Sequence, residues 1–156
     1  MNSFKLIGLP FEPFSHLFAL SDAELSACNA RRVFATTKPG YPCRVSLSDA
    51  DIGDELLLLP FKHQAANSPY RSSGPIFVRK TAAPADLDAG VVPDYVRTRL
   101  ISARAYDSAH LMTDALVCEG TGVGDAIQAM FAHEEIAYIH LHNAKRGCFS
   151  CAAVRA

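Results

Sequence analysis

The nine prolines of this 156-residue chain all fall between Pro10 and Pro93. Proline lacks the backbone N–H that helices and sheets use, and its ring fixes φ. This distribution predicts a first part with short elements and many loops, followed by a more regular second part. No linker-like stretch rich in Gly and Ser or in charge separates the two parts. We therefore expect one domain over residues 1–156.

The composition is that of a globular chain, and it excludes several functional classes. Hydrophobic residues make up 49% of the chain and charged residues 20%, whereas a disordered chain is poor in the former. The net charge of −1 lacks the basic excess of a nucleic-acid-binding domain. No apolar run reaches the roughly eighteen residues of a membrane span. We expect a soluble protein that binds neither nucleic acid nor a membrane.

The N-terminus and the cysteines predict the compartment. The short apolar run from Leu6 to Leu9 follows a single late lysine and is interrupted by Pro10, which is not the pattern of a secretory signal. The five cysteines, an odd number, indicate free thiols in a reducing compartment. We therefore expect a cytoplasmic protein, and the sequence leaves its oligomeric state open.

Hydrophobic periodicity predicts two helices. Ser21 and Glu24 have the spacing of a capping box, which predicts a helix over 22–31. An apolar stripe at helical spacing predicts a second helix over 125–133. Strands are predicted at 44–47, 56–59, 75–79, 100–106, 113–118 and 136–142, and one helical turn within 84–90.

The second predicted helix lies between the last two predicted strands. The connection from Cys118 to Ile136 is long enough for a crossover between parallel strands, although an antiparallel return stays open. The sum is an α+β fold with a mainly antiparallel or mixed sheet and two helices. One of these helices belongs to a C-terminal strand–helix–strand unit.

The most reactive side chains gather near the C-terminus. His140 and His142 are two residues apart in a predicted strand, so both point to one face, with Cα atoms about 7 Å apart. Ile139 and Leu141 point the other way and are expected to be buried. The face that carries the histidines is therefore either solvated or the floor of a cleft.

A C-x-x-C pair, Cys148 and Cys151, follows the two histidines. Together with His140 and His142 it supplies four ligands of the kind that zinc prefers. Residues three apart on a straight strand point to opposite faces, however, so this set needs a turn, and Gly147 precedes the first cysteine. Zinc is therefore an alternative and not the favoured cofactor. The same thiols also allow a redox role or simple packing as small apolar groups.

Arginine outnumbers lysine ten to five, and guanidinium groups match carboxylates and phosphates in geometry. The segment 68–74, Ser-Pro-Tyr-Arg-Ser-Ser-Gly, has the small and polar residues of an anion-binding loop. The candidate ligand-binding residues are Arg71, Ser72, Ser73, Arg79, Arg104 and Asn143.

Four segments resemble a known family. They are residues 38–47 (KPGYPCRVSL), 68–79 (SPYRSSGPIFVR), 104–107 (RAYD) and 142–151 (HNAKRGCFSC). In these segments the chain resembles the bacterial family catalogued as domain of unknown function 1203. The resemblance covers most of the chain and implies a small, stand-alone bacterial protein. It implies no activity, substrate or cofactor.

These patterns favour binding of a small, anionic ligand in a cleft between the C-terminal strand and the loop at 68–79. His140 and His142 would act as acid–base or ligand groups and Cys148 as a thiol, so enzymatic activity stays open. This hypothesis predicts that the candidate side chains converge in one pocket. The alternatives are a zinc-stabilised structural module, a thiol-redox protein and a protein-interaction domain with an exposed apolar patch.

Overall fold

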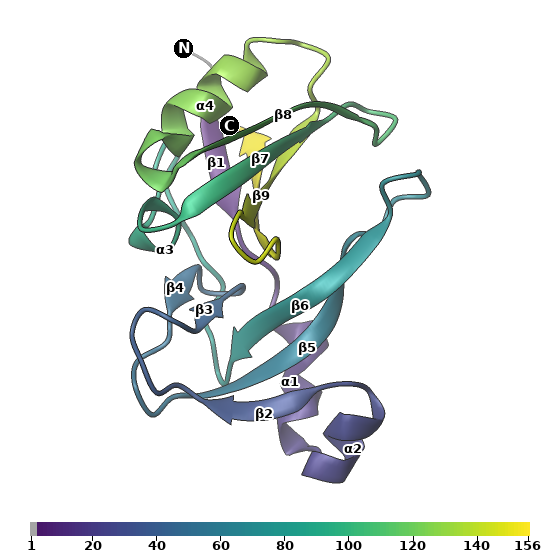
Figure 1. The fold of residues 1–156 in the computed structure, drawn as a ribbon, viewed down its shortest axis with the longest axis vertical. Coiled ribbons are helices and arrows are strands. Elements are labelled where there is room, and N and C mark those ends of the chain that lie inside the picture. Colours follow the sequence, from purple (N-terminus) through teal and green to yellow (C-terminus); the bar gives the residue numbers. More distant parts are fainter. Residues whose placement is uncertain (1–2) are drawn as a thin grey trace.

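Two five-stranded sheets make up the structure, a computed structural model that describes residues 3–156 (Figure 1). The first sheet has the order β1-β10-β9-β7-β8 and the second β2-β5-β6-β3-β4. The strands are β1 (Phe4–Ile7), β2 (Arg31–Phe34), β3 (Pro42–Cys43), β4 (Ser48–Asp49), β5 (Glu55–Gln64), β6 (Ser72–Arg79), β7 (Leu100–Tyr106), β8 (Met112–Glu119), β9 (Tyr138–Asn143) and β10 (Phe149–Arg155). The helices are α1 (Glu12–Ser15), α2 (Asp22–Ala27), α3 (Asp94–Arg97) and α4 (Val123–Phe131), with 3-10 turns at His16–Ala19 and Gly120–Gly122.

The two predicted helices are present as α2 and α4, and the α+β class is confirmed. The Ser21 hydroxyl accepts a hydrogen bond from the Glu24 N–H at 3.2 Å, and the Glu24 carboxylate accepts one from the Ser21 N–H at 3.3 Å, which is a complete capping box. The helix ends at Ala27 and not at residue 31, because Asn29 takes a left-handed φ of 59° and β2 begins at Arg31. The shorter helices α1 and α3 were not predicted.

The C-terminal strand–helix–strand unit consists of β8, α4 and β9. Both β8 and β9 pair antiparallel with β7, so they run parallel to each other on either side of it, and α4 is the crossover. One face of this sheet packs against α4, with Ile101, Ile139 and Leu141 buried against Ile127 and Phe131. The first strand, β1, pairs with the last, β10, as Figure 1 shows at the top of the molecule.

The second sheet is built on the long β5–β6 hairpin. It is mixed, because β3 pairs parallel with β6 while its other pairs are antiparallel. Phe14 of α1 and Leu25 of α2 pack in one buried cluster with Leu57 and Ile76 of this hairpin. Proline did not shorten these strands, since Pro60 and Pro75 lie directly opposite each other within the hairpin.

Two local predictions are wrong. Residues 44–47 form the turn between β3 and β4 and not a strand: the Leu47 N–H bonds to the Cys43 carbonyl at 3.0 Å, and Leu47 has a φ of 50°. The segment 84–90 contains no helical turn, because its N–H groups bond to other parts of the chain, as Gly90 does to the Phe4 carbonyl. None of the helices within residues 3–156 combines the length and the apolar character that crossing a membrane requires.

Candidate functional site

The two histidines of β9 lie on a covered face of the first sheet. Directly across from them on β7 are Arg104, opposite His140, and Ser102, opposite His142, and residues opposite each other share a face. Ile139 belongs to the core on the other face, as the alternation predicted. His140 is 8% exposed and His142 only 1%, so this face is not solvated.

The second sheet covers this face and contributes a third histidine. The ring of His63, on β5, lies 4.9 Å from that of His142 and 6.4 Å from that of His140, centroid to centroid. One ring nitrogen from each of the three lies within 4.8 Å of the others. We call His63, His140 and His142 the histidine cluster. Gln64, the residue after His63, also reaches β9, because the register of β5 shifts just before it. The Gln64 amide donates a hydrogen bond to the Tyr138 hydroxyl at 3.0 Å.

Burial keeps the histidine cluster neutral at pH 7. Phe149 of β10 stacks parallel to the ring of His63 at 5.7 Å and meets the rings of His140 and His142 edge-on. Burial lowers the pKa of His140 and that of His142 to about 4, and the positive charge of Arg104 acts in the same direction. Burial also lowers the pKa of His63.

The hydrogen bonds of the histidine cluster leave ring nitrogens without partners. Nδ1 of His142 lies 2.9 Å from the Gly147 carbonyl oxygen, which only accepts, so Nδ1 carries the proton and Nε2 keeps a lone pair. That Nε2 is buried without a hydrogen-bond partner, as are Nδ1 of His140 and Nδ1 of His63. Three neutral imidazoles with unpaired buried nitrogens have the donor set of a transition-metal site.

The structure does not bring the four predicted zinc ligands together. The group of potential metal ligands contains both histidines of β9 with His63 and neither cysteine. Cys148 accepts a hydrogen bond from Nη2 of Arg44 at 3.1 Å. Cys151 is buried in the core beneath α4, and burial raises the pKa of its thiol to about 12. All five cysteines of the chain are free thiols.

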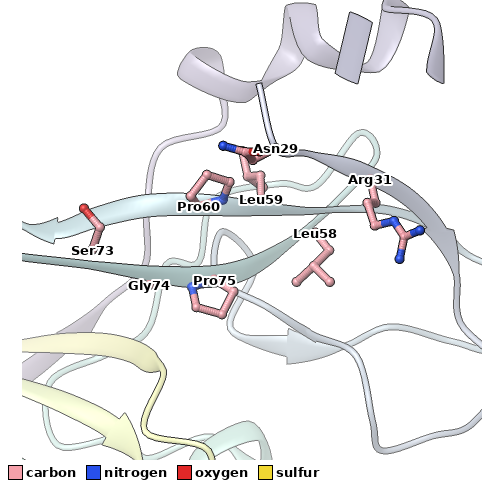
Figure 2. A pocket seen from close by; sticks show the side chains of 8 residues that line it. All are labelled: Asn29, Arg31, Leu58, Leu59, Pro60, Ser73, Gly74 and Pro75. Atoms are coloured by element: carbon pink, nitrogen blue, oxygen red, sulfur yellow. The ribbon is translucent and has the colours of Figure 1, made fainter. Parts of the chain in front are cut away.

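The predicted anion contacts also lie in different places. Arg104 is beside the histidine cluster, whereas the charge of Arg79 acts on Asp51. Arg71 and Ser72 are exposed beside the β5–β6 turn. Ser73 lines a shallow hollow of about 360 Å³, shown in Figure 2 with the side chains that line it: Asn29, Arg31, Leu58, Leu59, Pro60 and Pro75.

The turn of the β5–β6 hairpin reaches the first sheet. The Ser68 hydroxyl donates to the His110 carbonyl at 3.1 Å, and Tyr70 packs edge-on against Tyr106 at 6.0 Å. Tyr106 lies 5.2 Å from His140, ring to ring. This turn therefore closes over one side of the histidine cluster.

A cavity of about 440 Å³ lies where the two sheets meet. Arg44 lines it from the β3–β4 turn, and Asn143, Lys145, Arg146 and Cys148 line it from β9 and the β9–β10 turn. Three of the four segments that carry the family resemblance, 38–47, 68–79 and 142–151, thus contribute residues to the lining of this cavity. Asn143 is the one predicted ligand-binding residue that lines it.

The fold and these sites define an α+β protein of two sheets, with a histidine cluster of two buried members and one half-buried member and with a cationic cavity at the junction of the sheets. Residues 40–155 match the family described as protein of unknown function (DUF1203), and the chain belongs to this family, as the resemblance indicated. No curated protein and no solved structure matches the chain.

Proposed function

We propose that this protein binds a divalent transition-metal ion, zinc first, through His63, His140 and His142. The observation that carries the proposal is that each of these three histidines has a buried ring nitrogen without a hydrogen-bond partner, and that one ring nitrogen of each lies within 4.8 Å of the others. Leaving a buried polar atom unpaired costs about 1–3 kcal/mol. A bound metal ion would give a ring nitrogen of each histidine a partner.

Three further features support a metal ion. Imidazole nitrogens about 2.0–2.1 Å from a tetrahedral zinc ion lie about 3.3 Å apart, so modest rotations of the rings would complete the site. The hydrogen bond from His142 Nδ1 to the Gly147 carbonyl holds the ring with Nε2 free, which is how proteins orient metal-binding histidines. The low pKa values of His140 and His142 keep both in the neutral form that binds metals.

Three protein ligands leave one position of a tetrahedral ion for another molecule. Zinc sites with three histidines and one such position are typical of catalytic centres, where the ion activates water or polarises a bound group. Arg104 lies opposite His140 on the same face and adds positive charge beside this position. We therefore propose that the fourth ligand is a small anion, which retains the predicted anionic ligand in a more specific form.

A cobalt titration tests this proposal. Chelator-treated protein is titrated with Co²⁺, and we expect one ion per chain with the visible absorption of tetrahedral nitrogen coordination, which Zn²⁺ then abolishes. The H63Q, H140Q and H142Q substitutions should each weaken binding at least about 100-fold, because each removes a direct ligand. The matched control is H16Q, since His16 is exposed and outside the histidine cluster.

Unfolding measurements complete the test. At a free metal concentration of 100 times the dissociation constant, bound metal should raise the free energy of unfolding by about 2.7 kcal/mol. Circular dichroism checks that each variant is folded. Binding of Co²⁺ that is equally tight in H16Q and H63Q would show that the ion binds elsewhere and would overturn the proposal.

A further inference from the structure

The cavity at the junction of the sheets contains a buried positive charge with no acidic partner. The Arg44 side chain is 1% exposed and donates hydrogen bonds to the Phe149 carbonyl at 2.7 Å, the Pro42 carbonyl at 2.7 Å and the Cys148 sulfur at 3.1 Å. None of the ion pairs found among residues 3–156 includes Arg44. A guanidinium stays charged in a protein, and burying it without a counter-charge is unfavourable. We propose that the cavity binds a small organic anion whose phosphate or carboxylate group is the missing counter-charge of Arg44.

The remaining polar lining has the same sign. Lys145 and Arg146, both exposed on the β9–β10 turn, line the cavity beside Arg44. Arg99 also lines it and is held by an ion pair with Asp49. The lining contains no carboxylate, and the chain as a whole has a net charge of −1, so the positive charge is concentrated here. Such a concentration attracts anions into a cleft.

Apolar side chains in the lining select the rest of the ligand. Leu58, Pro75 and Phe77 of the second sheet line the cavity. A volume of about 440 Å³ is within the range of small-molecule sites, in which apolar walls hold the body of a ligand and a few polar groups orient it. Asn143, also in the lining, has an Oδ1 atom with no hydrogen-bond partner that can accept from a ligand hydroxyl. The ligand is therefore an anion with a small apolar body.

The test uses three small probes of similar size on the whole chain. Phenyl phosphate and phenylacetate carry the two anionic groups, and phenol is the neutral comparison. The protein is chelator-treated H63Q, so that no probe can bind through a metal in the histidine cluster. By calorimetry we expect at least one anion to bind about tenfold or more tightly than phenol, and the better of the two identifies the anionic group.

Surface variants keep the test independent of folding, because Arg44 itself is buried. The double substitution K145Q/R146Q should weaken binding of the better anion about tenfold or more. K62Q is the matched control, since Lys62 is an exposed cation that does not line the cavity. Added NaCl should weaken binding of the better anion less in K145Q/R146Q than in the protein that keeps Lys145 and Arg146.

A chemical reporter gives a second readout at the cavity itself. In a C28S/C118S background Cys148 is the one thiol that is not fully buried, because Cys43 and Cys151 are. The better anion should slow its alkylation by iodoacetamide at least about fivefold, with the rate measured by mass spectrometry. Equal binding of phenol and both anions, no binding of any probe at millimolar concentration, or equal affinity in K62Q and K145Q/R146Q would overturn the proposal. None of these results bears on metal binding by the histidine cluster.

Discussion

At the level of single residues, the unusual feature is that several polar groups are buried where two sheets meet. His140 and His142 lose their solvent contact there, and Phe149 supplies an apolar wall against both rings. Arg44, from the β3–β4 turn, is buried as well and donates a hydrogen bond to the carbonyl of Phe149. Burying an imidazole nitrogen without a hydrogen-bond partner, or a guanidinium without a counter-charge, costs free energy. We infer that both are retained for what they bind.

The two low pKa values predict how stability depends on pH in the metal-free protein. A histidine in the unfolded chain has a pKa of about 6.5, whereas burial lowers the pKa of His140 and that of His142 to about 4 in the folded chain. Between these values the unfolded chain binds more protons, so the stability present above pH 6.5 is lost as the pH falls towards 4. Each residue contributes at most about 3 kcal/mol to this loss.

Urea unfolding of chelator-treated protein at pH 7.5 and pH 4.5 measures this loss. The H140Q variant should lose less stability over the interval than the natural chain, because it has one buried titrating group fewer. H133Q, which removes an exposed histidine, should behave like the natural chain. A similar acid loss in H140Q and H133Q would show that the histidine cluster does not cause it.

At the level of elements, the β9–β10 turn connects the two proposed sites. Its Gly147 has a φ of 79°, and its carbonyl accepts the hydrogen bond from His142. The neighbouring Lys145, Arg146 and Cys148 line the cavity. The conformation of one short turn therefore orients a proposed metal ligand and positions the cations of the anion site.

Replacing Gly147 by alanine tests the role of this turn. A non-glycine residue in the left-handed region costs about 1–2 kcal/mol, and no atom lies within 4 Å of the added Cβ. We expect G147A to lose about that much stability and to bind Co²⁺ about tenfold more weakly, as loss of an orienting hydrogen bond typically does.

Gly90 offers a control for the backbone effect alone. It has the same φ of 79° and equally open space, and it lies outside both sites. G90A should therefore lose comparable stability and keep its full affinity for Co²⁺. Equal metal affinities in G147A and G90A would show that the carbonyl of Gly147 does not orient His142.

At the level of the whole molecule, hydrogen bonds join the two sheets at the junction that carries the sites. Arg44 in the β3–β4 turn of the second sheet donates to Phe149 of the first, and Gln64 of β5 donates to Tyr138 of β9. The first strand of the chain pairs with the last, so the first sheet requires both ends of the sequence. We expect the chain to unfold as one cooperative unit, in keeping with the single domain predicted from the sequence.

The substitution L25A tests this cooperativity from outside the sites. Leu25 is fully buried between α2 and the second sheet, so its loss should cost about 2–5 kcal/mol. If the sheets unfold together, hydrogen exchange should accelerate as much at Leu141 in the first sheet as at Leu57 in the second. Acceleration confined to the second sheet would contradict cooperative unfolding. F34A, which truncates an exposed side chain, is the control and should change the exchange rates little.

Sequence patterns predicted the elements that depend on neighbouring residues. The capping box placed α2, the apolar stripe placed α4, and β7 runs over the predicted residues 100–106. The same reasoning was wrong for residues 44–47, because Val45 and Leu47 alternate with polar residues in a buried turn just as they would in a strand. Alternation reports which side chains are buried and not the backbone conformation that buries them.

The sequence by itself determined the α+β class, the family and the pairing of His140 with His142 on one face, since each follows from short-range patterns. Only the tertiary structure decided that the third member of the cluster is His63 and that Arg44 is buried without an acidic partner. His63 precedes the other two histidines by about half of the chain's length and Arg44 precedes Cys148 by about two thirds of it, so no local spacing relates them. Their proximity comes from the docking of one sheet on the other, which depends on contacts summed over the whole molecule.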